Sequence, residues 1–296
     1  MEWQKSFNMN KKAYRIEKNS GHGFARRLSI DLASNRYVAL MDADDISLSN
    51  RFEVQIPFLA QGFDIVGGQI SEFSNNPNEI THYRLVKLSH DEIIKDLKKR
   101  CPMNQVTVAF DKHAYYKAGG YIDFYCNEDY YLWIRMALMN CSFANVPNIL
   151  VNVCADEGMV SRRKGKKYYH SEKRIQKLLL DCKLINCFRY FLNTFKRFIA
   201  DIIVSRFFPS LFLKLAHSSE YKCANIENRS IEVKKQPFSV CMCVYNGDNL
   251  EKFKRSVESV KNQTLPPDEI ILVIDGPIYS ELEDYIQEEF GSIENI

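Results

Sequence analysis

Three apolar segments of this chain each run into acidic or amide side chains, and that pattern sets the fold class. The segments are 37–41, 238–245 and 269–274, and the polar groups that follow them are Asp42, Asp44, Asp45, Asn246, Asp248 and Asp275. Each segment has the length and the continuous apolar character of a strand buried on both faces. Segments with helical spacing alternate with them, at 24–35, 50–61 and 250–260. This alternation predicts an α/β layer architecture, and residues 238–296 have the pattern of a nucleotide-binding half-sheet.

Composition narrows the classes of function. The chain has 296 residues, of which 46% are hydrophobic and 26% are charged, as in an ordinary globular protein. Its net charge of +3 is too small to predict nucleic-acid binding. The nine cysteines are odd in number and scattered, so we expect no zinc site and a reducing compartment. A polar N-terminus and the lack of any apolar run of about 18 residues predict a cytoplasmic chain without signal peptide or membrane span.

The acidic corner, defined as residues 42–45, is the first candidate site. Asp42, Asp44 and Asp45 follow a predicted buried strand and would repel one another at neutral pH unless a cation or a donor array offsets their charge. Hard divalent ions prefer carboxylate oxygens and often bridge to substrate phosphates. The corner therefore predicts a metal-and-diphosphate site. The alternative is a solvated turn that caps the helix beginning near Arg51.

From Ser161 onward the sequence becomes basic and then amphipathic. Through 171–217, phenylalanine and other apolar residues are interleaved with lysine and arginine. A basic amphipathic helix can lie in a membrane interface, with its apolar face among acyl chains and its cations on anionic head groups. The alternative is a helix that packs its apolar face on its own domain. Residues 218–237 are polar and are predicted to form a linker.

Ordered motifs cover most of the chain outside 180–237. They are Phe238-Ser-Val-Cys-Met-Cys-Val-Tyr-Asn-Gly-Asp, Val260-Lys-Asn-Gln-Thr, Val273-Ile-Asp-Gly-Pro, Lys18-Asn-Ser-Gly-His-Gly, Met41-Asp-Ala-Asp-Asp, Arg51-Phe-Glu-Val-Gln, Asp64-Ile-Val-Gly-Gly, Arg100-Cys-Pro-Met-Asn, Gly119-Gly-Tyr and Asn127-Glu-Asp-Tyr-Tyr-Leu-Trp. Within each block the set resembles family-2 glycosyltransferases with the GT-A fold, of the bacterial amylovoran-biosynthesis and O-antigen type. The resemblance implies a GT-A (Rossmann-like) mixed sheet flanked by helices.

The order of the motifs differs from that of the family. There, the counterpart of 238–296 comes first and leads directly into the counterpart of 1–170. We interpret the chain as a circular permutant: 1–170 is the C-terminal two thirds of the GT-A domain, 171–217 a basic amphipathic helical segment, 218–237 a linker, and 238–296 the N-terminal nucleotide-binding third. The alternatives are a window across two tandem transferase domains, inactive alone, and two chains that exchange halves. A single domain requires strand 238–245 to pair beside strand 37–41 within one chain.

The resemblance implies transfer of a sugar from a UDP-sugar donor with inversion at the anomeric carbon. Four positions match donor-binding residues of the family: Tyr245, Asn246 and Asp275 for the nucleobase and ribose, and Arg26 for the diphosphate. Asp42 and Asp44 match a DxD-type motif, with Asp44 as the direct metal ligand and Asp42 on the ribose or the metal's water shell. The implied cofactor is Mn²⁺ or Mg²⁺, which neutralises the departing diphosphate.

The acidic pair Glu128-Asp129 matches the family's general-base position. Inversion needs one carboxylate to take the proton of the acceptor hydroxyl, and Asp129 is favoured over Glu128 for that role. The alternative is a pair of carboxylates that stabilises a helix N-terminus. Trp133, one turn further on, is a candidate to stack on an acceptor sugar, with a core tryptophan as the alternative.

Three basic residues are candidates for phosphate binding. Arg162, Arg163 and Lys166 could contact a phosphate of the donor or of a lipid-diphosphate acceptor, or simply form a solvated basic surface. The expected acceptor is a saccharide or lipid-diphosphate-saccharide of a growing bacterial surface polysaccharide. The expected location is therefore cytoplasmic, with peripheral contact at the inner membrane. A non-catalytic nucleotide-sugar-binding protein with the same fold is the alternative function.

Overall fold

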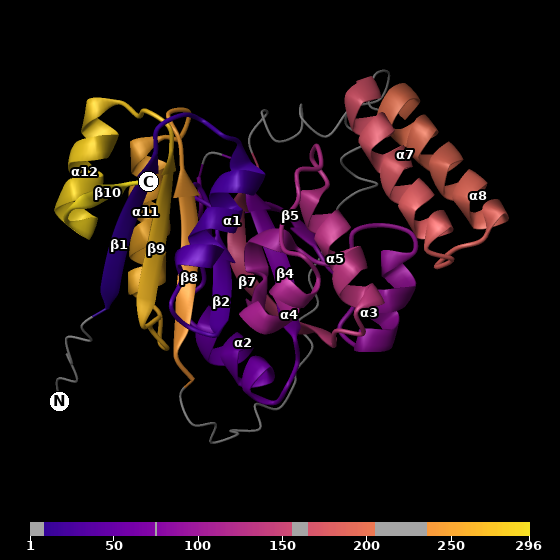
Figure 1. Ribbon diagram of the computed structural model, residues 1–296, viewed down its shortest axis with the longest axis horizontal. Coiled ribbons are helices and arrows are strands. Elements are labelled where there is room, and N and C mark those ends of the chain that lie inside the picture. The colour runs from indigo at the N-terminus through magenta and orange to yellow at the C-terminus, as the bar shows by residue number, and fades with distance from the viewer. Residues whose placement is uncertain (1–8, 75, 156–164, 205–235) are drawn as a thin grey trace.

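The protein is built on one ten-stranded mixed sheet with helices on both faces (Figure 1). The computed structural model describes residues 9–74, 76–155, 165–204 and 236–296. Its strands are β1 (Asn10–Ile16), β2 (Tyr37–Met41), β3 (Ile46–Ser47), β4 (Ile65–Phe73), β5 (Ile80–Arg84), β6 (Ala109–Asp111), β7 (Phe143–Cys154), β8 (Phe238–Val244), β9 (Glu269–Asp275) and β10 (Ile293–Asn295). Its helices are α1 (His22–Leu32), α2 (Arg51–Ala60), α3 (His90–Leu97), η1 (Gln105–Thr107), α4 (Lys112–Lys117), α5 (Glu128–Leu138), α7 (Gly165–Asp181), α8 (Cys187–Phe198), η2 (Ile199–Val204), α11 (Leu250–Lys261) and α12 (Ser280–Phe290).

Strands from the two ends of the sequence are interleaved in the sheet. The order is β10-β1-β9-β8-β2-β6-β4-β7-β3, with β5 paired to β4. The first five strands are parallel, and β8 lies directly beside β2 in the register Tyr37↔Phe238 to Met41↔Met242. Figure 1 shows the indigo strands β1 and β2 on either side of the orange and yellow strands β8 and β9. The predicted pairing of 238–245 beside 37–41 within one chain is therefore confirmed.

Each face of the sheet carries its own apolar core. On β2, Tyr37, Ala39 and Met41 belong to one core, and Val38 and Leu40 belong to the other. The first core is closed by α2, α11 and α12, and the second by α1, α3, α4, α5 and α7. A strand buried on both faces has no polar face, which is why β2, β8 and β9 appear in the sequence as continuous apolar runs. The predicted α/β sheet flanked by helices is confirmed.

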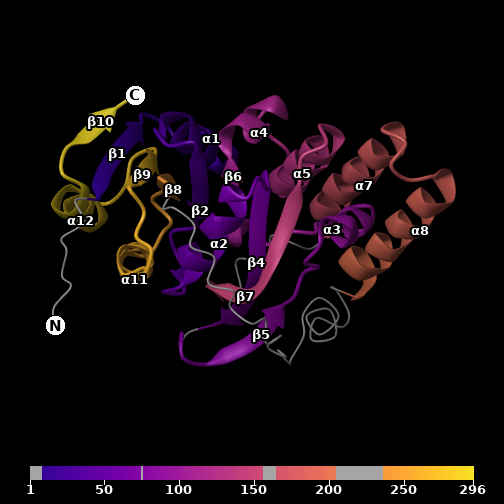
Figure 2. The same ribbon diagram turned by 90° about the horizontal axis from the view of Figure 1, so that it is seen from below.

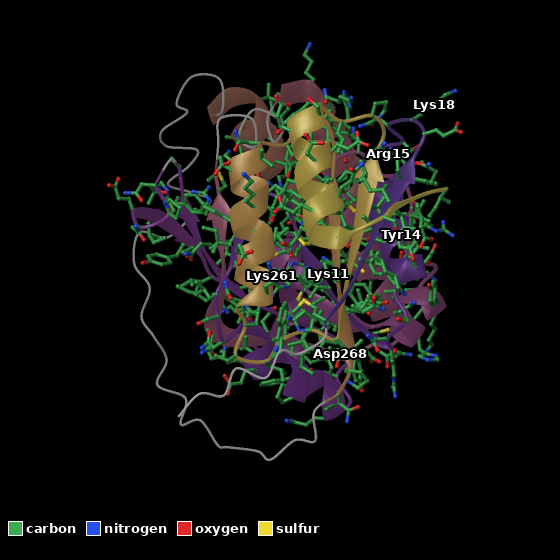
Figure 3. The ribbon with its side chains drawn as sticks, turned by 90° about the vertical axis from the view of Figure 1, so that its left-hand side faces the viewer. Lys11, Tyr14, Arg15, Lys18, Lys261 and Asp268 are labelled. Atoms are coloured by element: carbon green, nitrogen blue, oxygen red, sulfur yellow. The ribbon has the colours of Figure 1, made fainter. Side chains whose placement is uncertain are left out.

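Charged contacts also join the two ends of the sequence at the sheet edge. Glu289 of α12 accepts a hydrogen bond from Lys11 of β1 at 2.7 Å and forms an ion pair with Lys261 of α11 at 2.9 Å. Figure 3 shows Lys11 and Lys261 close to each other on these two elements. Such partly exposed pairs contribute at most about 1 kcal/mol each, so the apolar cores carry most of the stability.

In its described part, up to residue 204, the basic amphipathic zone forms α7 and α8, with η2 after α8. Helices α7 and α8 are joined by a tight turn in which Lys183 has a left-handed φ of 58°. They stand together at the end of the molecule away from β10 (Figure 2). Helix α7 packs on the domain through Ile175 and Leu179. Within the described ranges, no helix is both long and apolar enough to cross a membrane. Nearly all of the predicted linker 218–237 lies outside the described residues.

Candidate active site

Four parallel strands place their carboxyl ends along one edge of the sheet. Strands β1, β9, β8 and β2 are neighbours and parallel, so the loops that follow them open on the same side. These loops are residues 17–21, 276–279, 245–249 and 42–45. The sheet topology therefore brings the acidic corner and the predicted nucleoside-binding residues to one edge, although they are far apart in the sequence.

The three aspartates of the acidic corner have different surroundings. Asp42 and Asp44 are half-buried, whereas Asp45 is only 2% exposed. Oδ1 of Asp45 accepts a hydrogen bond from the backbone N–H of Cys154 at 2.8 Å, which ties the corner to the end of β7. Burial, together with the nearby charges of Asp44 and Asp42, raises the pKa of Asp45 well above its ordinary value. Asp45 is thus tied to the end of β7, whereas Asp42 and Asp44 lie half-buried at the sheet edge.

Buried side chains from α2 and α11 hold the backbone of the corner. Arg51 has no exposed surface, and its guanidinium donates to the carbonyl oxygen of Leu40 at 2.8 Å. Burial lowers the pKa of Arg51 to about 9, against the opposing effect of the corner's carboxylates. Ser256 of α11 donates to the carbonyl oxygen of Asp42 at 2.9 Å. These contacts fix the path of the chain on both sides of Met41.

Gln263 connects the C-terminal segment to the loop after the corner. Its side-chain amide donates to the carbonyl oxygen of Leu48 at 2.8 Å and lies 3.2 Å from the hydroxyl of Ser47. The next residue, Thr264, donates its backbone N–H to the carbonyl oxygen of Ser49 at 2.8 Å. The Asn-Gln-Thr motif of one sequence block therefore supports the acidic corner of the other.

Arg26 links the acidic corner to the acidic pair on α5. Its guanidinium donates to Oδ1 of Asp42 at 2.9 Å and lies 3.9 Å from Oε1 of Glu128. The side chain is almost fully buried, and burial alone would lower its pKa. Asp42, then Tyr121 and Glu128, together outweigh this effect and hold the pKa of Arg26 above its ordinary value, so the guanidinium stays charged. A fixed cation at this position suits a diphosphate ligand.

Two residues without an assigned role in the sequence also contact Arg26. Gln105, with its amide oxygen turned toward Arg26, accepts from Nη1 at 2.5 Å and from the hydroxyl of Tyr121 at 3.0 Å. His22, one helical turn before Arg26, also contacts the guanidinium. In the sequence, His22 lies in the Asn-Ser-Gly-His-Gly motif, and Gln105 directly follows Asn104. Neither residue type indicated that Arg26 would be its partner.

The acidic pair begins α5, with its two carboxylates in different contacts. Burial and the neighbouring Asp129 raise the pKa of Glu128, while Arg26 opposes that rise. Asp129 accepts from the backbone N–H of Tyr130 at 2.7 Å, and its other oxygen is 3.6 Å from the sulfur of Cys101. Glu128 therefore faces the Arg26 side of the edge, and Asp129 faces the Cys101 side.

Asp275 holds the loop that precedes α1. Its two carboxylate oxygens accept from the backbone N–H groups of Ser20 at 2.7 Å and Gly21 at 3.0 Å. The loop approaches so closely that a Cβ on Gly276 would lie 2.7 Å from the backbone nitrogen of Asn19. The side chain of Asp275 is only 5% exposed, so it positions this loop as well as ending β9.

The loop after β8 adds a further carboxylate. Tyr245 and Asn246 are exposed, and the tyrosine ring lies over Gly247. Asp248 accepts from the backbone N–H of Tyr245 at 2.9 Å. Burial and then the charges of Asp44 and Asp42 raise the pKa of Asp248 to about 7. Asp248 therefore belongs electrostatically to the acidic corner, a link that the sequence pattern could not show.

The remaining candidates differ in placement. Trp133 has no exposed surface and lies in the second core, so the structure supports the core alternative and leaves no ring face for an acceptor sugar. Lys166 is exposed in the first turn of α7. Arg162 and Arg163 lie outside the described residues.

The donor set at the corner fits a hard divalent cation that shares its coordination with a substrate. In the part of the chain that the structure describes, no three His, Cys, Asp or Glu side chains converge as a complete metal site. Mg²⁺ commonly takes only one or two carboxylates and fills its other positions with water and phosphate oxygens. Asp42 and Asp44 supply two such groups, and their charges add to burial, the larger cause, in raising the pKa values of Asp45 and Asp248.

Comparison with known proteins decides the family. The model of glycosyl transferase family 2 matches residues 2–122 and 239–294, which is more than half of the chain. The chain belongs to glycosyltransferase family 2. An uncharacterized glycosyltransferase of Haemophilus influenzae is 43% identical over 169 residues, covering 56% of this chain and 62% of the relative. The amylovoran biosynthesis glycosyltransferase of Erwinia amylovora is 34% identical over 170 residues, covering 57% and 63%.

A third relative has a named reaction. The UDP-Gal:α-D-GlcNAc-diphosphoundecaprenol β-1,3-galactosyltransferase of Escherichia coli is 29% identical over 215 residues, or 72% of this chain and 77% of the relative. Of the first two relatives, by contrast, the chain spans just under two thirds of the length. The predicted family, of the amylovoran and O-antigen type, is confirmed, and the mixed sheet is consistent with its GT-A fold.

Proposed function

We propose that this family-2 glycosyltransferase moves a sugar from a UDP-sugar to a lipid-linked saccharide, with inversion and with a divalent metal. The observation that carries the proposal is the pair of contacts that Arg26 makes with Asp42 and Glu128. Through this one buried cation, a carboxylate of the DxD-type motif is joined to the acidic pair on α5. A donor diphosphate bound beside Arg26 would lie between the proposed metal ligands and the proposed base. The rest of the site supports that arrangement.

The uridine is proposed to lie over the carboxyl ends of β8 and β9. The exposed ring of Tyr245 offers a stacking face, and Asn246 offers amide donors and acceptors. The carboxylate of Asp275 is an acceptor for the uracil imide N–H or a ribose hydroxyl, since a carboxylate oxygen can accept more than the single backbone bond that it makes here. Arg26 is proposed to contact the diphosphate.

The metal is proposed to be Mn²⁺ or Mg²⁺, held directly by Asp44, with Asp42 on its water shell or on the ribose. When bound, it supplies charge neutralisation to the leaving diphosphate. Arg26 supplies a second, permanent positive charge from the side of α1. Both charges act where negative charge develops during the reaction, which is where electrostatic stabilisation accelerates it.

Asp129 is proposed as the general base. Glu128 faces the guanidinium of Arg26, so its role is to position that cation. Among the described residues, Asp129 has a bond within its own helix turn and a weak thiol contact, and no described cation pairs with it, so it is proposed to take the proton of an acceptor hydroxyl. The attacking oxygen then displaces the diphosphate from the opposite face of the sugar, with inversion.

The acceptor and the domain organisation are inferred from the relatives and from the sheet. The Escherichia coli relative is named for a diphosphoundecaprenol-linked acceptor, and we extend that acceptor class to this chain. Lys166 at the start of α7, with Arg162 and Arg163, is proposed to bind acceptor phosphate. The single sheet favours one GT-A domain, in which 238–296 is the nucleotide-binding third and 1–170 the remaining two thirds. It argues against a segment that spans two tandem domains and against two chains that exchange halves.

The test is transfer from UDP-sugars to a synthetic lipid-diphosphate-saccharide, with Mn²⁺ and then with EDTA. We expect turnover that EDTA abolishes and that Asp44→Ala lowers by at least about a thousandfold, because both remove charge stabilisation of the leaving group. Asp181→Ala on α7 is the matched control, since this exposed aspartate pairs with Lys177 away from the sheet edge. Its turnover should equal that of the unchanged protein.

Other outcomes separate the alternatives. UDP binding with Mn²⁺ but no transfer to any acceptor, and no hydrolysis of any UDP-sugar, would identify a non-catalytic nucleotide-sugar-binding protein. Activity confined to a dimeric fraction in size-exclusion chromatography would instead support exchanged halves. If Asp129→Asn retains turnover and Glu128→Gln loses it, the base assignment is reversed.

A further inference from the structure

Helix α8 is oriented with its polar side toward the protein and its apolar side outward. Asn193 is buried and donates to the carbonyl oxygen of Lys98 at 2.9 Å and to Oε1 of Gln176 at 2.8 Å. Arg197 pairs with the buried Glu172 at 3.1 Å. An ordinary surface helix does the reverse and buries its apolar stripe. Polar contacts therefore hold much of α8 on its own domain, together with the ring of Tyr190, which packs against the second core.

The opposite side of α8 carries a phenylalanine face. We define this face by its five exposed apolar residues: Phe188, Phe191, Phe195, Phe198 and Ile199. Phe188, Phe191 and Phe195 are 76%, 69% and 62% exposed. Their spacing of three and four residues places them on one side of the helix. So contiguous an exposed set of large apolar side chains marks an interaction surface.

Two cations border the phenylalanine face. On an α-helix, Arg189 and Lys196 lie seven residues apart and therefore on the same flank, next to the apolar stripe. Both are exposed, and α8 has no aspartate or glutamate between Cys187 and Phe198. Long cationic side chains at the border of an apolar stripe can reach head-group phosphates while the rings enter the acyl region. The charge complementarity is to an anionic surface.

We propose that the phenylalanine face of α8 docks on an anionic phospholipid bilayer. The helix lies at the outer end of the molecule in both Figure 1 and Figure 2, so a flat surface can approach it without meeting the sheet. Helix α8 lies in the interface plane, with its rings below the head groups and its cations among the phosphates. This placement holds the catalytic domain beside a membrane.

The experiment is cosedimentation of the full chain with vesicles, without donor or metal, so that its outcome is independent of catalysis. Vesicles of phosphatidylglycerol with phosphatidylethanolamine are compared with vesicles of phosphatidylcholine alone. We expect binding to the anionic vesicles that weakens as salt is raised, because surface attraction is screened. Phe191→Ser with Phe195→Ser should lower the partition coefficient by at least about tenfold, since two large rings no longer leave water.

Matched controls separate the face from general surface properties. Leu138→Ser with Met139→Ser removes two exposed apolar side chains from the end of α5 and should leave binding unchanged. Arg189→Gln with Lys196→Gln should weaken binding by at least about tenfold at low salt, whereas Lys117→Gln with Lys254→Gln, which removes the same charge elsewhere, should change it far less. Circular dichroism melting checks that every variant is folded.

Three results would overturn the proposal. The unchanged protein fails to bind anionic vesicles, or the phenylalanine variant binds as well as the α5 control. In the third, the unchanged protein sediments as a dimer without lipid, and the phenylalanine variant no longer forms the dimer but still binds vesicles. That result would identify the face as a contact between two copies of the chain.

Discussion

Gln263 gives the sharpest test of how the C-terminal segment supports the acidic corner. Its side chain is 6% exposed, and its amide donates to the carbonyl oxygens of Leu48 and Ser259, both at 2.8 Å. Gln263→Met keeps the volume and removes the amide. The change therefore isolates the hydrogen bonds from the packing.

The expected cost follows from the two donors that are lost. A net contribution of about 1 kcal/mol for each bond gives a loss of about 2 kcal/mol in the free energy of unfolding. The carbonyl oxygen of Leu48 keeps the backbone N–H of Arg51 at 2.9 Å, so this acceptor still has a partner in the variant.

Urea unfolding followed by circular dichroism measures this change, with Thr264→Val as the matched control. Thr264 is exposed and donates its hydroxyl to Glu53 at 2.7 Å, while its backbone bond to Ser49 survives the substitution. We expect the control to cost less than about 1 kcal/mol. The reasoning fails if Gln263→Met and Thr264→Val differ by less than about 0.5 kcal/mol.

Three further predictions concern single side chains of the site and core. Because the pKa of Asp45 is raised in the folded state, unfolding free energy in EDTA should fall as pH rises above the ordinary aspartate pKa of about 4 toward the raised value, and Asp45→Asn should flatten that slope; an unchanged slope in urea titrations of the variant would contradict the raised pKa. Asp275→Asn should cost about 2 kcal/mol, because an amide can accept only one of the N–H groups from Ser20 and Gly21; an equal urea midpoint would refute it. Trp133→Phe should leave the acceptor KM within about twofold, since the ring is core; a large rise in KM with unchanged kcat would restore the stacking role.

The sequence predicts the sheet well where strands are buried on both faces. Segments 37–41, 238–245 and 269–274 became β2, β8 and β9 almost residue for residue, because apolar runs bounded by polar groups have few other solutions. Strand β7 was not predicted. Pro147 lies inside its twelve residues, and a proline normally argues against a strand next to other strands. The register shifts in the β4–β7 ladder accommodate this irregular stretch.

Candidate residues were predictable by type but not by contact. The carboxylates Asp42, Asp44 and Asp275 could be singled out, because a charged side chain at the end of a buried strand does not improve the packing of the core. Their partners could not, because Arg26–Asp42 and Asp275–Gly21 depend on how separate loops meet across the sheet edge. The helical zone was predicted as amphipathic, yet which side of α8 faces the protein depends on the polar partners on α3 and α7.

The strand order also determines when this protein can fold during its synthesis. Strand β1 lies between β9 and β10, and β2 pairs with β8, so β1 and β2 leave the ribosome well before these partners. Until then, their N–H and C=O groups are open edges that can pair with other chains. Contacts of such long sequence separation slow folding. We therefore expect nascent chains that stop before β8 to aggregate or to bind chaperones, whereas synthesis through β9 and β10 lets the sheet close.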